Sequence, residues 1–488
     1  MISQLEAYRQ QTFSSLRSPH RYPFYDSLGK FRDPATLRQR EIAFYQKRIQ
    51  ENPQDGLDRA SLAATYLGMA KVTGEGSWYL LAEQTAKQSL ANLPFDNPGA
   101  LSVLARLAEA RHDFAGALKL AEQIPDEWEA LAIRTTSHLA IGNLSSARAA
   151  ADAWVDLTLS SQAFLMQAIV QVAQGEAGAI ASFNHALEVE EAGEISTSAR
   201  IRTVLGRFYY ERGQLDLAHD LYQESLNILP NYPPALLNLA QLAIRQGGLN
   251  TATNYYDQLQ ALYPGNTSVY TPLILRGQAR IKSIQGDATA TELWQQAETL
   301  LRQSLVNPKF SNPDANPRSN LESNSGSNPG SNLESNSGFN SGSNPGSNSG
   351  ANPGFNSESN SGSDPGSTLG HRRDLARLLL ERGRTQDYPE ALTLMEQEIK
   401  NRHDADTLNL YAWALLQTGQ LTQAQTVIQK AIATGTQDPE ILFRASQIEQ
   451  ALGHSQQSQN YVQQVLKIDP QFGDRARQAI GLGAGLGG

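Results

Sequence analysis

The sequence predicts an all-α fold, a right-handed superhelix of stacked helical hairpins that is interrupted by one long polar tract. Three observations indicate it. Marker residues recur at a spacing of 34 in two separate parts of the chain, the apolar residues between them follow helical spacing, and no segment has the pattern of a strand. A repeat of this length is typical of a solenoid, because one hairpin cannot bury its apolar face alone and must pack on the next.

The clearest pair of repeats lies between residues 199 and 264. Its markers recur 34 positions later: Gly213, Ala218, Tyr222 and Pro230 are followed by Gly247, Ala252, Tyr256 and Pro264. Each residue type has a packing reason. Small residues let the two helices cross closely, Gly tolerates the left-handed turn between them, and Pro ends the second helix.

A second pair of repeats lies near the C-terminal end of the sequence. Leu408, Ala412, Gly419, Ala424, Ile428 and Ala431 are matched 34 residues later by Leu442, Ser446, Gly453, Ser458, Val462 and Val465. Further hairpins follow the same pattern of marker residues less regularly, at residues 82–94, 104–121, 142–154, 179–186, 290–297 and 391–395. We therefore expect about nine or ten stacked hairpins.

These markers resemble the tetratricopeptide repeat, whose pattern is a small residue in the first helix, Gly at the turn, Ala followed by an aromatic residue, and a closing Pro. The resemblance covers roughly residues 34–307 and 375–470, with Ser225 and Leu259 where the family usually has Ala. The run LNLYAWALLQTGQ and the residues after it also look like the end of bacterial tetratricopeptide arrays of poorly defined role. The resemblance implies a binding scaffold.

The chain divides into five segments by composition. They are an N-terminal segment, partly helical or flexible (1–34), an N-terminal array (35–306), an Asn/Ser/Gly/Pro-rich linker (307–370), a C-terminal array (371–478) and a flexible Gly-rich tail (479–488). The linker has almost nothing to bury, so we expect it to be disordered. It is either an insertion between neighbouring hairpins or a tether between two arrays.

The composition of the chain argues against several classes of function. A net charge of −9 disfavours nucleic acid as a partner, and no stretch is apolar enough for membrane insertion. The start of the sequence lacks the apolar core of a secretory signal, so we expect a cytoplasmic protein, or a periplasmic one if a signal peptide is missing. There is no cysteine, the histidines are scattered, and no phosphate-binding or nucleophile motif occurs. We expect no enzyme activity, no cofactor and no metal.

The resemblance places the first helix of each hairpin on the inner, concave wall, and so implies a peptide-binding groove. The residues expected to line it are Arg207, Tyr210, Asn238, Gln241, Arg245, Asn409, Trp413, Phe443 and Arg444. Arginines can engage carboxylates, aromatic rings offer rigid anchors, and the amide of Asn238 can hold a peptide backbone. Two other interpretations stay open: the aromatic residues also fit packing between repeats, and the arginines also fit pairing with neighbouring carboxylates.

The sequence thus predicts a non-catalytic scaffold that binds a partner protein or peptide in a concave groove. Two alternatives remain. One is a structural protein that associates with copies of itself, and the other is the regulatory subunit of an enzyme. The partner and the oligomeric state are not predicted, because groove residues in this fold vary with the ligand.

Overall fold

The computed structural model describes residues 34–124, 127–191, 194–263, 268–306, 371–470 and 472–473. The expectations for the N-terminal segment before residue 34, the polar linker 307–370 and the Gly-rich tail lie outside these residues. Within the described residues all regular structure is helical apart from one isolated bridge, between Glu75 and Ser268. The predicted all-α fold class is confirmed.

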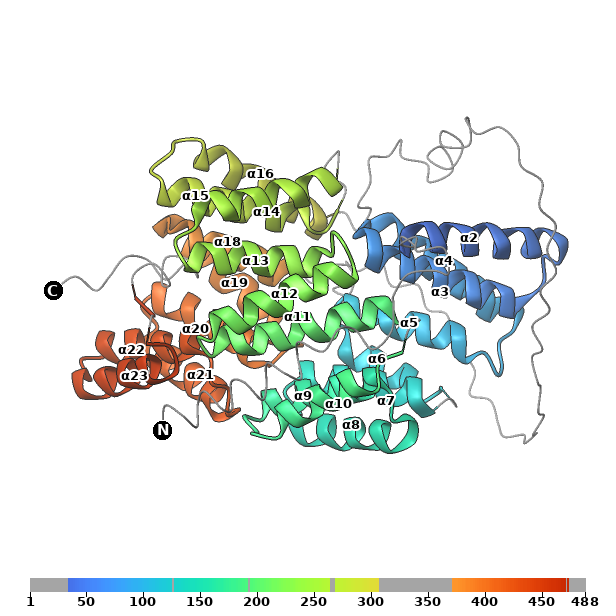
Figure 1. Cartoon of the computed structure of the whole chain (residues 1–488), viewed down its shortest axis with the longest axis horizontal. Helices are drawn as coiled ribbons and strands as arrows, with labels where there is room; N and C mark the ends of the chain where they lie inside the picture. The colour runs from blue at the N-terminus through green and yellow to red at the C-terminus, as the bar shows by residue number, and fades with distance from the viewer. Residues whose placement is uncertain are drawn as a thin grey trace.

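Among the described residues, the first helix is α2 (Pro34–Glu51), and ten antiparallel hairpins follow it (Figure 1). The hairpins are α3 (Gly56–Thr73) with α4 (Gly76–Asn92), α5 (Pro98–Ala110) with α6 (Phe114–Ala121), α7 (Glu127–Ala140) with α8 (Leu144–Thr158), α9 (Ser161–Ala173) with α10 (Ala179–Glu188), α11 (Ile195–Glu211) with α12 (Leu215–Ile228), α13 (Pro233–Arg245) with α14 (Leu249–Leu262), α15 (Thr271–Ile284) with α16 (Ala290–Val306), α18 (His371–Arg382) with α19 (Tyr388–Glu398), α20 (Ala405–Gln417) with α21 (Leu421–Ala433), and α22 (Pro439–Ala451) with α23 (Ser455–Ile468). A short 3-10 turn, η2 (Thr385–Asp387), precedes α19.

The hairpin turns have the geometry that the repeat predicts. Gly213 and Gly247 adopt φ values of 67° and 81°, in the left-handed region that favours glycine. Gly206 lies where α11 and α12 cross closely, because a Cβ added there would lie 2.5 Å from Cε1 of Tyr222. The 34-residue markers are therefore the positions where backbone conformation or space allows little else.

His112 occupies the turn position where most hairpins have glycine, with φ of 61°. From the sequence a capping role is its simplest interpretation, but that role belongs to the next residue, Asp113, whose carboxylate accepts the backbone N–H of Gly116 at 2.9 Å. The His112 ring instead lies between Glu398, 2.5 Å from Nδ1, and Arg402, 3.2 Å from Nε2. It joins parts of the chain that are far apart in sequence.

The stack of hairpins continues from α16 to α18. One apolar core extends from Leu275 to Phe472 and includes residues on both sides of the 307–370 segment. Two ion pairs reinforce this junction: Glu298 with Arg382, at 2.5 Å, and Arg302 with Glu390, at 2.5 Å. The two described arrays therefore form one superhelix.

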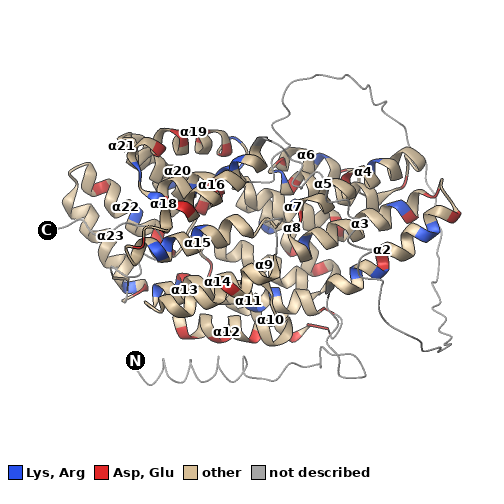
Figure 2. Cartoon of the chain, turned by 90° about the horizontal axis from the view of Figure 1, so that it is seen from above, with Lys and Arg blue, Asp and Glu red and all other residues tan. Residues whose placement is uncertain are grey.

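The superhelix curls until its last hairpins touch its middle ones. The backbone N–H of His403 donates to the carbonyl of Ala140 at 2.8 Å, and Gly175 meets Gly435 so closely that a Cβ on Gly435 would lie 2.6 Å from the carbonyl oxygen of Gln174. We call this line of contacts the seam: residues 112, 140–142, 174–175 and 213 against residues 398–403, 435 and 469. Viewed from above, α15 and α18 lie between α13 and α14 on one side and α19 to α21 on the other (Figure 2). The inner helices thus face a common centre.

Candidate functional site

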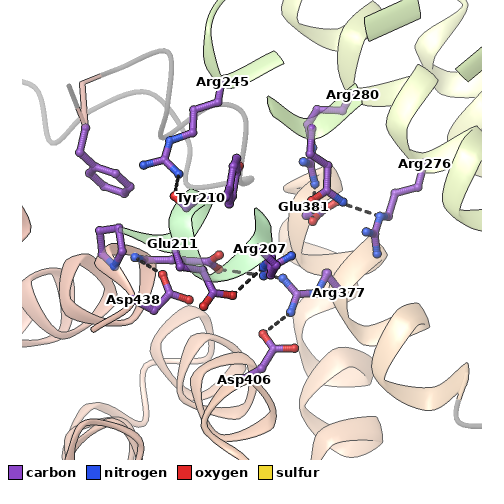
Figure 3. Close-up of a pocket in the computed structure, with 14 residues that line it drawn as sticks. Arg207, Tyr210, Glu211, Arg245, Arg276, Arg280, Arg377, Glu381, Asp406 and Asp438 are labelled. Atoms are coloured by element: carbon purple, nitrogen blue, oxygen red, sulfur yellow. Dashed lines mark hydrogen bonds and ion pairs between the residues drawn. The ribbon is translucent and has the colours of Figure 1, made fainter. Parts of the chain in front are cut away.

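A charged cavity of about 190 Å³ lies at this centre (Figure 3). Its walls come from the first helices of successive hairpins, α11, α13, α15, α18, α20 and α22, and from a residue that follows α23. The lining residues are Arg207, Tyr210, Glu211, Gln241, Arg245, Arg276, Arg280, Arg377, Glu381, Asp406, Asp438, Pro439, Glu440 and Phe472. The site therefore combines five arginines, five acidic residues and two aromatic rings.

Buried ion pairs organise the wall formed by α15, α18 and α20. Glu381 lies between Arg280, with which it pairs, and Arg276, whose Nε is 3.5 Å away. Burial pushes the pKa of the Glu381 carboxyl upward, but the charges of Arg280, Arg276 and Arg377 outweigh it and hold that pKa below its usual value. Arg377 also donates to Asp406 at 2.7 Å. These groups are ionised and mutually oriented, which makes the wall a rigid set of hydrogen-bonding groups.

The opposite wall combines Arg207 and Glu211 of α11 with Asp438, the residue that precedes α22. Nε of Arg207 donates to Glu211 at 2.6 Å, and the side chain is still 45 % exposed. Asp438 accepts the backbone N–H of Glu440 at 2.8 Å as the N-cap of α22. Burial, together with the negative charges of Glu211 and Glu440, raises the pKa of Asp438 to about 8. Arg207 is thus the arginine of this wall whose guanidinium is open to the cavity.

One end of the cavity is built around Arg245 of α13. Its guanidinium donates to the Tyr210 carbonyl at 2.8 Å, lies 4.6 Å from the centre of the Tyr210 ring, and pairs with Asp469. It is also 5.9 Å from the ring of Phe472. This end offers an apolar surface beside a cation, an arrangement that suits cation–π contacts.

The structure separates the nine expected groove residues into three sets. Arg207, Tyr210, Gln241 and Arg245 line the cavity together. Asn238 is partly buried on α13, outside the cavity lining. The remaining four, Asn409, Trp413, Phe443 and Arg444, are buried in the packing of the last hairpins. A peptide-binding role for the nine residues stays a prediction.

The burial of the last set has a clear cause, since these side chains pack on one another and on the next helix. The Arg444 guanidinium lies 3.9 Å from the centre of the Trp413 ring, and burial lowers the pKa of Arg444 to about 9. Phe443 packs on Phe472 with ring centres 5.6 Å apart, and Asn409 donates to Glu440 at 3.3 Å. The sequence predicts that these four residues line an open groove, whereas in the structure they are buried. Trp413 and Phe443 pack between repeats, which is the other interpretation of the aromatic residues.

Sequence reasoning missed most of the charged wall. Arg276 and Arg280 follow Gln241 and Arg245 by 35 residues each, so they occupy the same wall one hairpin later, with one extra residue in the connection. That offset is a usable signal. Asp406 and Glu440 are 34 residues apart, yet nothing in the sequence places them opposite α11 and α15.

Comparison with known protein families identifies the repeat. A model described as tetratricopeptide repeat matches residues 384–445, and a second model with the same description matches residues 439–472. Residues 384–472 of the chain therefore match the tetratricopeptide repeat family. Repeats of this kind form extended concave surfaces and are typical of scaffolds for protein–protein interaction.

Two curated relatives align with this chain over short regions. The uncharacterized protein ycf37 of Pyropia yezoensis is 37% identical over 68 residues, which is 14% of this chain and 38% of that protein. Cellulose synthase operon protein C of Xanthomonas axonopodis pv. citri is 36% identical over 74 residues, 15% of this chain and 5% of that protein. The chain therefore spans well under two thirds of the length of either relative.

Among solved structures, a tetratricopeptide repeat protein from Parabacteroides merdae aligns with 66% of this chain and 98% of its own chain, at 16% sequence identity and a TM-score of 0.32. None of the helices in the described residues is long and apolar enough to cross a membrane. Across the same described residues, no three His, Asp or Glu side chains form a group suited to a metal ion.

Proposed function

We propose that this protein is a non-catalytic scaffold that binds an extended segment of a partner protein in its central cavity. The observation that carries the proposal is the convergence of five arginines and two aromatic rings, from different hairpins, on one cavity. Guanidinium groups recognise carboxylates and backbone carbonyls, and aromatic rings supply rigid apolar contact.

The side-chain chemistry of the cavity favours binding over catalysis. Its described lining contains no Ser, Thr, Cys, Lys or His, so the residue types that usually act as nucleophiles or as proton carriers near neutral pH are not part of that lining. The acid with a pKa near neutrality, Asp438, is held by its capping bond at the start of α22. Fixed charges and aromatic rings are typical of a recognition surface.

Selection of a random peptide display library on the immobilised full chain tests the proposal. The variant Arg207→Ala with Gln241→Ala changes two cavity residues that do not belong to the buried core. We expect the selected peptides to bind this variant at least tenfold more weakly, a loss of about 1.4 kcal/mol, because the open guanidinium is gone.

A matched control changes two exposed residues on second helices, Asp220→Ala on α12 with Asn250→Ala on α14. It should bind the same peptides with wild-type affinity, and circular dichroism should show that all three proteins are equally helical. Peptides that bind the cavity variant as well as the wild type would place recognition elsewhere and contradict the proposal.

A further inference from the structure

One end of the cavity is occupied by the protein's own chain. Asp469 and Phe472 follow the last described helix, α23, and lie against residues of α11 and α13 that are more than 220 positions earlier in the sequence. Both side chains are almost completely buried, at 1% and 5% exposed. The short segment that carries them fills a surface formed by inner helices of the superhelix.

Asp469 supplies the anionic contact. Its carboxylate pairs with the guanidinium of Arg245, which is itself held by the Tyr210 carbonyl at 2.8 Å. The glycine at the α11–α12 turn makes room for the carboxylate, because a Cβ on Gly213 would lie 2.8 Å from the Asp469 Cβ. A side chain on that turn would therefore obstruct the ion pair.

Phe472 supplies the apolar contact. Its ring packs 5.6 Å from the ring of Phe443 and lies 5.9 Å from the Arg245 guanidinium, at the border of the cavity. Arg245 thus contacts both the acidic and the aromatic side chain. Three of the residues that the sequence singled out for peptide binding, Tyr210, Arg245 and Phe443, are the ones that this segment covers.

We propose that Asp469 and Phe472 act as an intramolecular ligand, and that the natural partner presents the same chemistry, an acidic residue three positions before an aromatic one. This inference rests on the function proposed above and names the partner class of the same site. The partner displaces the chain's own side chains when it binds. A built-in competitor lowers the apparent affinity of the free protein, because only the fraction with an open site binds.

The first experiment measures binding of an excised copy of the segment. The probe is a fluorescein-labelled, end-capped peptide of the sequence Ile-Asp-Pro-Gln-Phe-Gly, which corresponds to residues 468–473. In the full chain, Asp469→Ala with Phe472→Ala empties the site. We expect fluorescence anisotropy to show saturable binding to this variant, at least tenfold tighter than binding to the wild type.

Specificity is tested with two altered probes, one with Asn in place of Asp and one with Ala in place of Phe. Each should lose at least tenfold in affinity. The matched control protein is Leu466→Ala, which changes an exposed apolar residue of α23 and should bind the probe as the wild type does. A folded, emptied variant that binds neither the probe nor its altered forms would overturn the inference, as would equal binding of all three probes.

A second experiment does not depend on removing a buried ring. Because the chain has no cysteine, Gly473→Cys provides a unique attachment point for a dye beside Phe472, at an exposed residue. Saturating unlabelled probe peptide should displace the segment and lower the dye's anisotropy, and the peptide with Ala in place of Phe should not. An anisotropy that stays constant with the intact peptide would overturn the inference even if the emptied variant fails to fold.

The two proposals fail in different ways. Library peptides that need Arg207 and Gln241 but lack an acidic residue three positions before an aromatic one would leave the proposed function intact and refute this inference alone. A library without cavity-dependent binders would refute the proposed function itself.

Discussion

Asp438 has two roles at the start of α22, because it caps the helix and also lies in the cavity wall beside another acidic residue, Glu211 (Figure 3). Its pKa is raised from 3.8 to about 8 by burial and by Glu211 and Glu440. Between these two pH values the folded protein holds a proton on Asp438 that the unfolded chain has released. The contribution of this side chain to the free energy of unfolding therefore falls as pH rises, and it is lost once pH passes about 8.

Asp438→Asn keeps a capping oxygen and removes the titration. We expect urea unfolding at pH 5, 7 and 9 to show the variant gaining about 1–2 kcal/mol relative to the wild type as pH rises, a discounted value because the side chain is partly exposed. The equivalent cap one repeat earlier, Asp404, is the control. Burial raises the pKa of Asp404, but Arg402 and Arg373 lower it further, to below its usual value.

For Asp404→Asn the difference from the wild type should stay constant between pH 5 and pH 9, because the carboxylate is ionised in both states over that range. Parallel stability curves for Asp438→Asn and the wild type would show that the carboxyl of Asp438 does not titrate with a raised pKa.

At the scale of elements, the junction between α16 and α18 decides whether the chain has one array or two. Leu301 of α16 and Leu375 of α18 belong to the same buried core, and two ion pairs cross between the hairpins on either side. The described contacts continue from one hairpin to the next as they do elsewhere in the stack. The intervening residues are therefore not needed to hold the two helices together.

We predict that replacing residues 310–367 with about twelve Gly and Ser residues, which span about 20 Å, leaves the fold intact. The shorter connection should raise the free energy of unfolding by about 1 kcal/mol, because it costs less entropy to close. Differential scanning calorimetry should show one transition at an equal or slightly higher Tm. A lower Tm, or two separate transitions, would show that the arrays unfold independently.

At the scale of the whole molecule, the seam turns an open superhelix into a closed one. Its contacts include side chains, such as His112 with Glu398, and backbones, such as His403 with Ala140. Gly435 is one position where added bulk would meet the facing turn, at the carbonyl oxygen of Gln174. Closure brings α20 and α22 opposite α11 and so completes the cavity.

Gly435→Ala should open the seam, and Gly453→Ala provides a matched control. Both glycines have positive φ, 87° and 83°, so both substitutions carry a similar backbone cost, but a Cβ on Gly453 has no atom within 4 Å. We expect Gly435→Ala to lose about 1–3 kcal/mol more than the control, because of the added clash. Small-angle X-ray scattering should show a larger radius of gyration for Gly435→Ala alone, with helix content by circular dichroism the same in both variants. Equal radii of gyration for the two variants would mean that the seam accommodates the added methyl group without opening.

The sequence was informative wherever neighbouring repeats decide the outcome. Gly213 and Ala218 mark a turn and a crossing that every hairpin needs, so their spacing predicts the helices and their order. The same local rule placed Arg207 and Arg245 on inner helices. The repeat pattern was less informative for Trp413 and Arg444. A position that faces the groove in one hairpin can be covered by the next hairpin, and the 34-residue spacing does not predict which positions are covered.

The all-helical solenoid and its hairpins were determined by the sequence alone, because each repeat packs on its neighbour through contacts that recur at a fixed spacing. Tertiary structure decided the rest. Asp438 meets Glu211, and Asp469 meets Arg245, after the superhelix has completed its curl, and that curl is the sum of small rotations between many hairpins. The spacing of residues in the sequence does not predict the total rotation. The charged cavity and the segment that fills one end of it could therefore be identified only in the folded molecule.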